Sequence, residues 1–180
     1  ILEDAVVMSP CAAAAIYHRD IYVSMGGMAE YFFCYYEDVD LGLRFRLLGH
    51  ETIQLAGAKV RHVGSTTAGK NSKFIKYYVS RNRIWTFIRC VPGLLFAACL
   101  PLLILSIVTR LCFSIFAGDT STKLKAFFDA FRRLFRIWND RKVIQKARKS
   151  TVLQFGSDMT WSVGKLILRS SDCRPISPEK

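Results

Sequence analysis

Three carboxylates stand within four consecutive positions of this chain, Glu37, Asp38 and Asp40, directly after an aromatic cluster at residues 32–36. An acid held among aromatic rings and beside other acids has a raised proton affinity, which suits it to take a proton from a substrate. Asp38 is therefore a candidate general base. Carboxylates are equally typical of the first turn of an ordinary helix, where the N-terminal dipole stabilises them by ~0.3–1 kcal/mol. The spacing alone leaves both interpretations open.

The residues that follow predict a helix from 38 to 48, because apolar side chains recur at i, i+4 and i+7: Leu41, Phe45 and Leu48. Asp38 lies one turn before this stripe on the same face, so we expect it to point inward. Asp40 is rotated away from that face and has Arg44 four residues later as an ion-pair partner. Asp40 is accordingly predicted to be a structural acid.

A candidate metal ligand lies farther along the chain. The segment ETIQLAGAKVRHV predicts two strands with a turn at Gly57, the second running through Val60. His62 follows Val60 by two positions, so both should face the same side, toward the interior. A lone histidine on an apolar side is more often a core residue than a ligand, and the spacing does not separate these two interpretations.

Basic residues between 64 and 90 are candidates for binding a phosphate. The segment 64–73 is rich in Gly, Ser, Thr and Lys, so it is either a solvated connector or a loop that closes over a diphosphate with Lys70. Helical periodicity returns at 74–90, where Arg81 and Arg83 flank Asn82. These two arginines either hold a phosphate of a donor or an acceptor, or mark a membrane surface.

The N-terminal segment is expected to bring its backbone close to a bound molecule. Residues 5–17 predict a loop followed by a strand of small residues, with a core helix built on the four alanines as the alternative. A short helix within 18–27 should end at the pair Gly26 and Gly27.

An apolar run of 20 residues without a charge, 90–109, is long enough to cross a ~30 Å hydrocarbon layer. Basic residues flank both ends, and Pro92 and Pro101 interrupt the run. Because basic flanks favour the same side of a membrane, we expect a shallow or re-entrant hairpin bent near Pro101. A single span and a buried soluble hairpin are the alternatives.

Residues 123–149 predict a basic amphipathic helix. Phe, Leu and Trp repeat there at three- and four-residue steps, while Lys and Arg take the other faces. This pattern is typical of a helix that lies in a membrane interface, and a surface helix packed on a catalytic domain is the alternative. Periodicity fades after Ser150, which predicts a C-terminal tail.

The composition narrows the class of partner. The 180 residues carry a net charge of +12, and most of the excess follows Lys59, which predicts an anionic partner. Because the cations alternate with large apolar residues, an anionic membrane surface is favoured and nucleic acid is not expected. The six cysteines contain no CxxC pair, so we interpret them as small buried hydrophobes in a reducing compartment and not as a zinc site.

Three motifs in order, GGMAEYFFCYYEDVDLGLRFRLLGHETI, AKVRHVGSTTAG and YYVSRNRIW, resemble the acceptor-side half of family 2 glycosyltransferases, especially rhamnosyltransferase-like members of GT-A type. The resemblance covers roughly residues 5–90. It implies that Asp38 deprotonates the acceptor hydroxyl while Glu37 orients the site. It also implies that Asp40 and Arg44 brace the site and that His62 binds Mg²⁺ or Mn²⁺.

The chain departs from the family at one point on the acceptor side. Where the family usually carries Phe-Asp-Glu after the second glycine, this chain has Met28-Ala29-Glu30. One carboxylate is lost there, so either the acceptor preference differs from that of the family or Glu30 carries the acceptor-side role alone.

The resemblance implies an α/β fold, the acceptor-side half of a GT-A-type domain, followed by a helical membrane-associating region. The expected parts are the catalytic half at 1–83, an apolar hairpin or span at 84–118, a basic helix at 119–150 and a tail at 151–180. Since the nucleotide-binding half with its Asp-x-Asp motif is missing, we expect a C-terminal fragment that is inactive alone.

The implied activity is inverting transfer of a sugar from a nucleoside-diphosphate donor to a hydroxyl of a glycan or polyprenyl-linked acceptor. It would serve cell-surface polysaccharide synthesis at the cytoplasmic face of the cell membrane, with the chain peripheral or re-entrant. A non-catalytic protein that binds or scaffolds at a membrane surface is the alternative.

Overall fold

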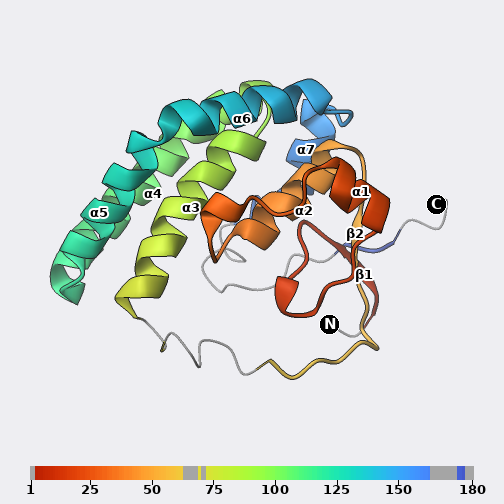
Figure 1. The fold of residues 1–180 in the computed structure, drawn as a ribbon, viewed down its shortest axis with the longest axis horizontal. Coiled ribbons are helices and arrows are strands. Elements are labelled where there is room, and N and C mark those ends of the chain that lie inside the picture. The colour runs from red at the N-terminus through yellow and green to blue at the C-terminus, as the bar shows by residue number, and fades with distance from the viewer. Residues whose placement is uncertain (1–2, 63–68, 70–71, 163–173, 177–180) are drawn as a thin grey trace.

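The structure is a computed structural model that describes residues 3–62, 69, 72–162 and 174–176. Helices dominate this part of the chain (Figure 1). The α-helices are α1 (Arg19–Ser24), α2 (Glu37–Leu47), α3 (Lys73–Cys90), α4 (Gly93–Ala117), α5 (Thr120–Arg132), α6 (Leu134–Ala147) and α7 (Val152–Asp158). Helices were expected at 18–27, 38–48 and 74–90, and α1, α2 and α3 confirm them.

The sheet seen in the described segments has two antiparallel strands, β1 (Ala5–Val7) and β2 (Thr52–Gln54). Val6 pairs with Ile53 on one side and forms an isolated bridge with Arg174 on the other. The α/β prediction, half of a GT-A-type domain, is therefore wrong. A doubly wound sheet needs several parallel strands joined by helices, whereas the long apolar stretches of this chain form helices that pack on one another.

A buried cluster centred on α3 holds the helices together. Ile84, Trp85 and Ile88 of α3 pack there against Phe32 and against residues of α5 and α6: Phe127, Ala130 and Ile137. The indole Nε1 of Trp85 donates to the carbonyl of Ala130 at 3.1 Å. In Figure 1, α3, α4 and α5 run side by side, and α6 continues from α5 across one end of α3.

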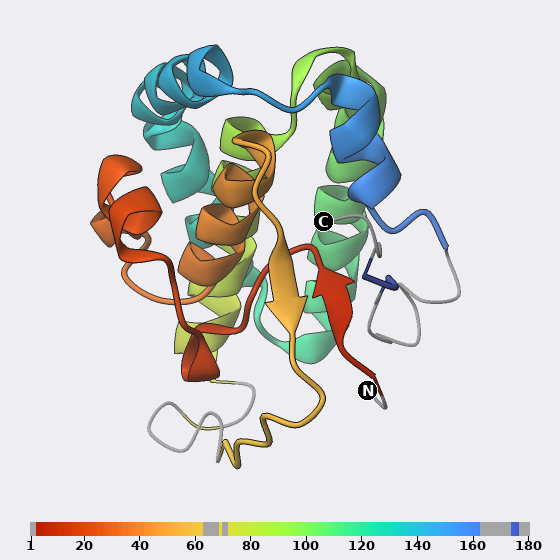
Figure 2. The same cartoon turned by 90° about the vertical axis from the view of Figure 1, so that its right-hand side faces the viewer.

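The N-terminal segment packs on α2 through a close contact at Gly42. A Cβ atom there would lie 2.5 Å from Cβ of Ser9 and 2.8 Å from Cδ of Pro10, so only glycine allows the approach. The alanines that follow form a short exposed 3-10 turn, Ala12–Ala14, and neither the expected strand nor the core helix. Figure 2 shows β1 and β2 side by side, with the N-terminal chain leading from the sheet toward α1.

The second strand expected through Val60 does not form. Residues 55–62 have no strand partner, and the side chain of Val60 is 63% exposed. β1 already occupies one edge of β2, and the described segments place no strand beside residues 58–60. The prediction that His62 points into an interior was consequently wrong, because His62 is exposed.

Helix α4 runs through Pro101 without ending there, so the hairpin bent near Pro101 is not formed. Proline removes one backbone hydrogen bond, and the remaining turns of this 25-residue helix stay intact. α3 is likewise continuous across residues 83 and 84, where a boundary was expected.

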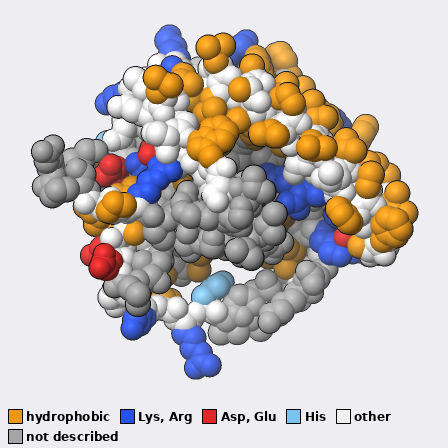
Figure 3. Space-filling model, turned by 180° about the vertical axis from the view of Figure 1, so that it is seen from behind, with side chains coloured by type: hydrophobic (Ala, Val, Ile, Leu, Met, Phe, Trp, Pro, Cys, Tyr) orange, Lys and Arg blue, Asp and Glu red, His pale blue; other side chains and the backbone are white. Residues whose placement is uncertain are grey.

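Most of α4 faces outward. Its most apolar 18-residue window has a mean hydropathy of 2.3, and 6% of that window is buried. By length and composition alone, α4 could cross a membrane. Figure 3 shows hydrophobic side chains gathered along the upper and right edges of the face seen from behind. Exposed large residues of α4 include Leu94, Leu102, Ile104, Leu105, Val108, Phe113, Ile115 and Phe116.

The helix expected at 123–149 is divided at Arg133 into α5 and α6. One face packs on α3, as described above. A second face remains exposed and aromatic, with Leu124, Phe128, Phe131, Phe135 and Trp138.

A carboxylate joins α3, α4 and α5 at one end of the bundle. Asp119, buried between α4 and α5, binds Nζ of Lys76 at 2.8 Å and Nζ of Lys123 at 3.3 Å. The hydrogen bond from Lys76 is the main cause that holds the pKa of Asp119 below its usual value.

Candidate active site

The backbone that leads into the carboxylates adopts an unusual conformation. Phe33, Tyr35 and Tyr36 have φ values of 67°, 63° and 71°, a backbone conformation that residues other than glycine rarely adopt. At Phe33 the chain makes a γ-turn, closed by a hydrogen bond of 2.9 Å from the amide of Cys34 to the carbonyl of Phe32. Such residues cost about 1–3 kcal/mol each, so the surroundings must hold this loop in place.

Asn82 of α3 holds the loop. Its side-chain nitrogen donates to the carbonyls of Phe32, Cys34 and Tyr35 at 3.0, 2.8 and 2.7 Å, and its side chain is 0% exposed. The guanidinium of Arg81 donates to the Asn82 Oδ1 at 2.9 Å. Asn82 therefore fixes the segment immediately before Glu37.

Arg81 also supports this loop and is buried. It donates to the Phe32 carbonyl at 3.0 Å and lies over the ring of Trp85 at 4.2 Å. These contacts do not support the prediction that Arg81 binds a phosphate, because protein partners enclose the Arg81 side chain. Lys70, a second proposed phosphate ligand, lies outside the described residues, and Arg83, the third, donates to Oγ of Ser106 on α4.

Asp40 is the centre of a buried charge network. Its Oδ2 binds Nε of Arg44 at 2.9 Å, and its Oδ1 lies 3.1 Å from Nε of Arg89. The thiol of Cys90 donates to Oδ1 at 3.5 Å. The expected pair with Arg44 is present, whereas Arg89 is a partner that i,i+4 spacing cannot reveal. Asp40 is 0% exposed, so it faces the core although the sequence pattern turned it away.

Arg44 extends the network to the glycine turn after α1. Its Nη1 donates to the carbonyl of Met25 at 2.9 Å, and its Nη2 donates to that of Gly27 at 2.6 Å. The ion pair thereby links α2 to the segment that carries Glu30.

Asp38 and Glu37 have different surroundings from Asp40. Asp38 is half-buried and accepts the amide of Ala12 at 3.1 Å and that of Val39 at 2.8 Å. Within the part of the chain that the structure describes, no cation pairs with either acid. Oε2 of Glu37 is buried without a hydrogen-bond partner, and burial raises the pKa of this carboxyl.

Tyr17 is a polar residue at this site that the sequence analysis missed. Its ring stacks on Phe45 of α2 with centroids 6.0 Å apart. Its hydroxyl is buried without a hydrogen-bond partner, and its pKa is raised first by burial and then by the charge of Asp38. Tyr17 lies 21 positions before Asp38 in the sequence, and no spacing rule connects the two.

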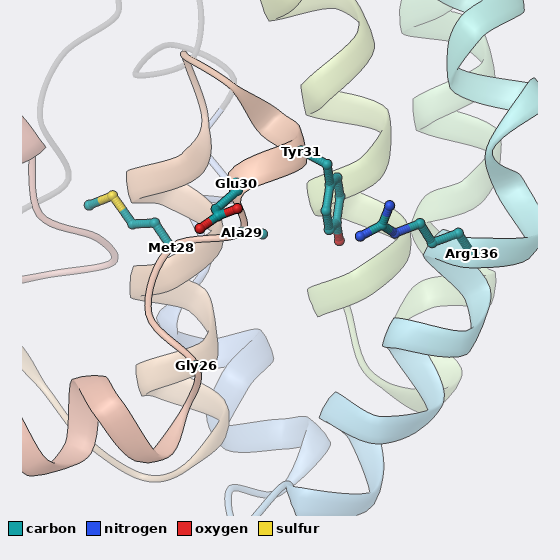
Figure 4. A pocket seen from close by; sticks show the side chains of 6 residues that line it. All are labelled: Gly26, Met28, Ala29, Glu30, Tyr31 and Arg136. Carbon is teal, nitrogen blue, oxygen red and sulfur yellow. The ribbon is translucent and has the colours of Figure 1, made fainter.

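A separate open pocket of about 590 Å³ lies beside Glu30 (Figure 4). Of the residues that line it, Tyr31 and Arg136 point toward one another, with the guanidinium 4.3 Å from the ring centroid. The Tyr31 hydroxyl is held by Arg89 and Asp140. The carboxylates at the start of α2 do not line this pocket, so Glu30 and Asp38 do not share it.

The expected metal centre does not fit the donors that are described. His62 is exposed, and no group of three or more His, Cys, Asp and Glu side chains that could hold an ion occurs among the described residues. Binding of Mg²⁺ or Mn²⁺ by His62 stays a prediction from the resemblance, and we derive no step through a metal.

Comparison with known proteins identifies no relative. No family model, no curated protein and no solved structure matches the chain. The resemblance to family 2 glycosyltransferases thus rests on the three motifs alone.

Proposed function

We propose that this chain supplies the acceptor side of a sugar transfer, with Asp38 as the general base. The observation that supports this role is the contrast among the three acids. Asp40 is neutralised by two arginines, whereas Asp38 and Glu37 keep carboxylate oxygens free of cationic partners among the described residues. A carboxylate that is half-buried and not ion-paired is suited to take a proton.

In the proposed reaction the acceptor hydroxyl attacks the anomeric carbon of a nucleoside-diphosphate sugar. A new carbon–oxygen bond forms, the bond to the diphosphate breaks with its electron pair, and the hydroxyl proton passes to Asp38. Glu37 and the Tyr17 hydroxyl orient the acceptor, because both offer buried polar atoms without a protein partner. The described residues contain no nucleotide-binding sheet, so the donor must be held by another segment or subunit.

The variant Asp38→Asn tests the base. The amide keeps the shape of the carboxylate and cannot accept the proton, so transfer should fall by about 10²- to 10⁴-fold while donor binding persists. The assay uses the protein together with its donor-binding unit, a panel of nucleoside-diphosphate sugars and membranes that carry the acceptor. The rate of transfer is measured as release of nucleoside diphosphate. Asp20→Asn, an exposed acid on α1, is the matched control. Turnover close to the control value would remove Asp38 from the mechanism.

We further propose that the acceptor side works at a membrane, with the apolar face of α4 in lipid. The exposed apolar length of α4 and the exposed aromatic face of α5 and α6 support this location. Lipid is favoured over a second copy of the chain because the net charge of +12 is complementary to an anionic leaflet and would repel another copy. The cytoplasmic face of the cell membrane is the location that we propose.

Vesicle flotation tests this location. Leu105→Asp places a charge on α4 where the side chain is 59% exposed, and Leu55→Asp does so in a loop at a residue that is 56% exposed. A charged residue in the hydrocarbon costs roughly 2.5–3.5 kcal/mol, so Leu105→Asp should weaken partitioning about 100-fold and Leu55→Asp should not. Equal behaviour of the two variants would contradict lipid contact by α4. Wild-type protein that floats with the vesicles but releases no nucleoside diphosphate would instead favour a membrane scaffold without catalysis.

A further inference from the structure

Arg83 of α3 carries a guanidinium that the protein satisfies only in part. Its Nη1 donates to Oγ of Ser106 on α4 at 3.1 Å. Its Nε and Nη2 are buried and have no hydrogen-bond partner. Two charged donors are thus withdrawn from water and left open at the seam between α3 and α4.

A second cation stands at the same seam. Arg110 lies four residues after Ser106 on α4, so the two share one face of the helix and lie one turn apart. Arg83, bound to Ser106, therefore faces the turn that carries Arg110. Burial, and after it the charge of Arg110, lower the pKa of Arg83. The seam brings two positive groups together.

The nearby carboxylate is already neutralised. Asp119 binds Lys76 and Lys123, and Nζ of Lys123 also donates to the carbonyl of Arg110 at 3.2 Å. In the segments that the structure describes, no ion pair joins Arg83 or Arg110 to an acid. The cluster therefore keeps an excess of positive charge.

A half-buried arginine beside a like charge is unfavourable unless an anion compensates it. Two guanidinium groups with open donors match the oxygens of a phosphate better than those of any other common anion. We propose that Arg83 and Arg110 form a binding site for the phosphate group of a membrane lipid. A lipid is favoured over free phosphate because Ser106 and Arg110 belong to the exposed apolar helix α4, and in this respect the inference rests on the proposed membrane location.

Thermal unfolding of the full chain in a phosphate-free maltoside detergent tests the site. A short-chain phosphatidic acid should raise the unfolding midpoint of the wild type, and the matching diacylglycerol should not. Arg83→Gln and Arg110→Gln should each weaken the apparent affinity about 10- to 100-fold, the value of one charged hydrogen bond. Arg133→Gln, which removes an exposed cation between α5 and α6, is the matched control and should bind as the wild type does.

Unfolding midpoints measured in detergent without any phosphate ligand distinguish a binding role of Arg83 from a structural role. Arg83→Gln should unfold there at or above the wild-type midpoint, because it removes an unpaired cation. A midpoint clearly below that of Arg133→Gln would make Arg83 a structural residue and overturn the proposal. Unchanged affinity in both variants would overturn it as well. An equal response to inorganic phosphate would refute the lipid assignment. Failure of the membrane location would appear separately, as loss of wild-type flotation.

Discussion

The loop that carries the aromatic cluster should depend on one amide, so Asn82→Ala is the most informative perturbation. The substitution leaves the carbonyls of Cys34 and Tyr35 without a donor, while that of Phe32 keeps its bond from Arg81. Each orphaned carbonyl costs about 1–3 kcal/mol, so we expect a loss of about 4 kcal/mol in unfolding free energy. In a chain of this length that loss corresponds to a fall of roughly 8–16 °C in the unfolding midpoint.

Denaturant unfolding followed by tryptophan fluorescence, to which Trp85 contributes from its place against this loop, measures the loss. Limited proteolysis should cut the variant between residues 32 and 37 much faster than the wild type, because the strained turns lose their support. Asn139→Ala on α6 is the control, since its side chain forms no hydrogen bond within the described part of the chain. A loss below about 1 kcal/mol, or one equal to that of the control, would refute the role of Asn82.

Three further predictions concern stability. Asp40→Asn leaves Arg44 without its ion-pair partner and leaves Arg89 with only Asp140, at 3.8 Å. Denaturant unfolding should therefore show a loss of about 3–5 kcal/mol, and a loss near zero would contradict the network. Gly42→Ala should destabilise the fold by about 1–2 kcal/mol because the added Cβ meets Ser9. Gly156→Ala should stabilise it by about 0.5–1 kcal/mol because the nearest side-chain atom is 3.7 Å from the added Cβ. Stability changes of the same sign in the two variants would contradict the close contact at Gly42. Asp119 has a folded pKa below 3.8, so its contribution to stability is complete above that pH and is lost as the pH falls through the lowered value. The stability difference between wild type and Asp119→Asn should therefore be constant near neutral pH and shrink below 3.8; a difference independent of pH would exclude this role.

Local rules were sufficient for the helices and for one ion pair. Apolar spacing predicted α2 and α3 because one face of each helix is buried in the core, and Gly49, with φ of 86°, follows α2 as a left-handed residue should. The pair of Asp40 and Arg44 was predictable because i,i+4 neighbours meet on any helix.

Contacts between distant segments could not be predicted. Asn82 meets carbonyls 47 to 50 residues upstream, and its three acceptors are backbone groups without a side-chain signature. Val60 looked like a strand residue because its neighbours alternate, but a strand requires a partner edge, which the sequence does not display. Asp40 seemed to turn outward because only one face of α2 was considered, whereas Arg89 of α3 approaches it from the other side.

Asn82 and Arg83 are consecutive residues of α3, one bound to the loop before the acids and the other to the seam with α4. Consecutive helical residues point about 100° apart and are separated by about 1.5 Å along the axis. The single rigid helix α3 thus sets the distance between the proposed proton acceptor and the proposed lipid phosphate. One residue inserted between positions 82 and 83 would rotate everything beyond it by that angle, so only one of the two partners could be kept. The angular positions of residues 82 and 83 around the axis of α3 therefore matter as much as the identity of either side chain.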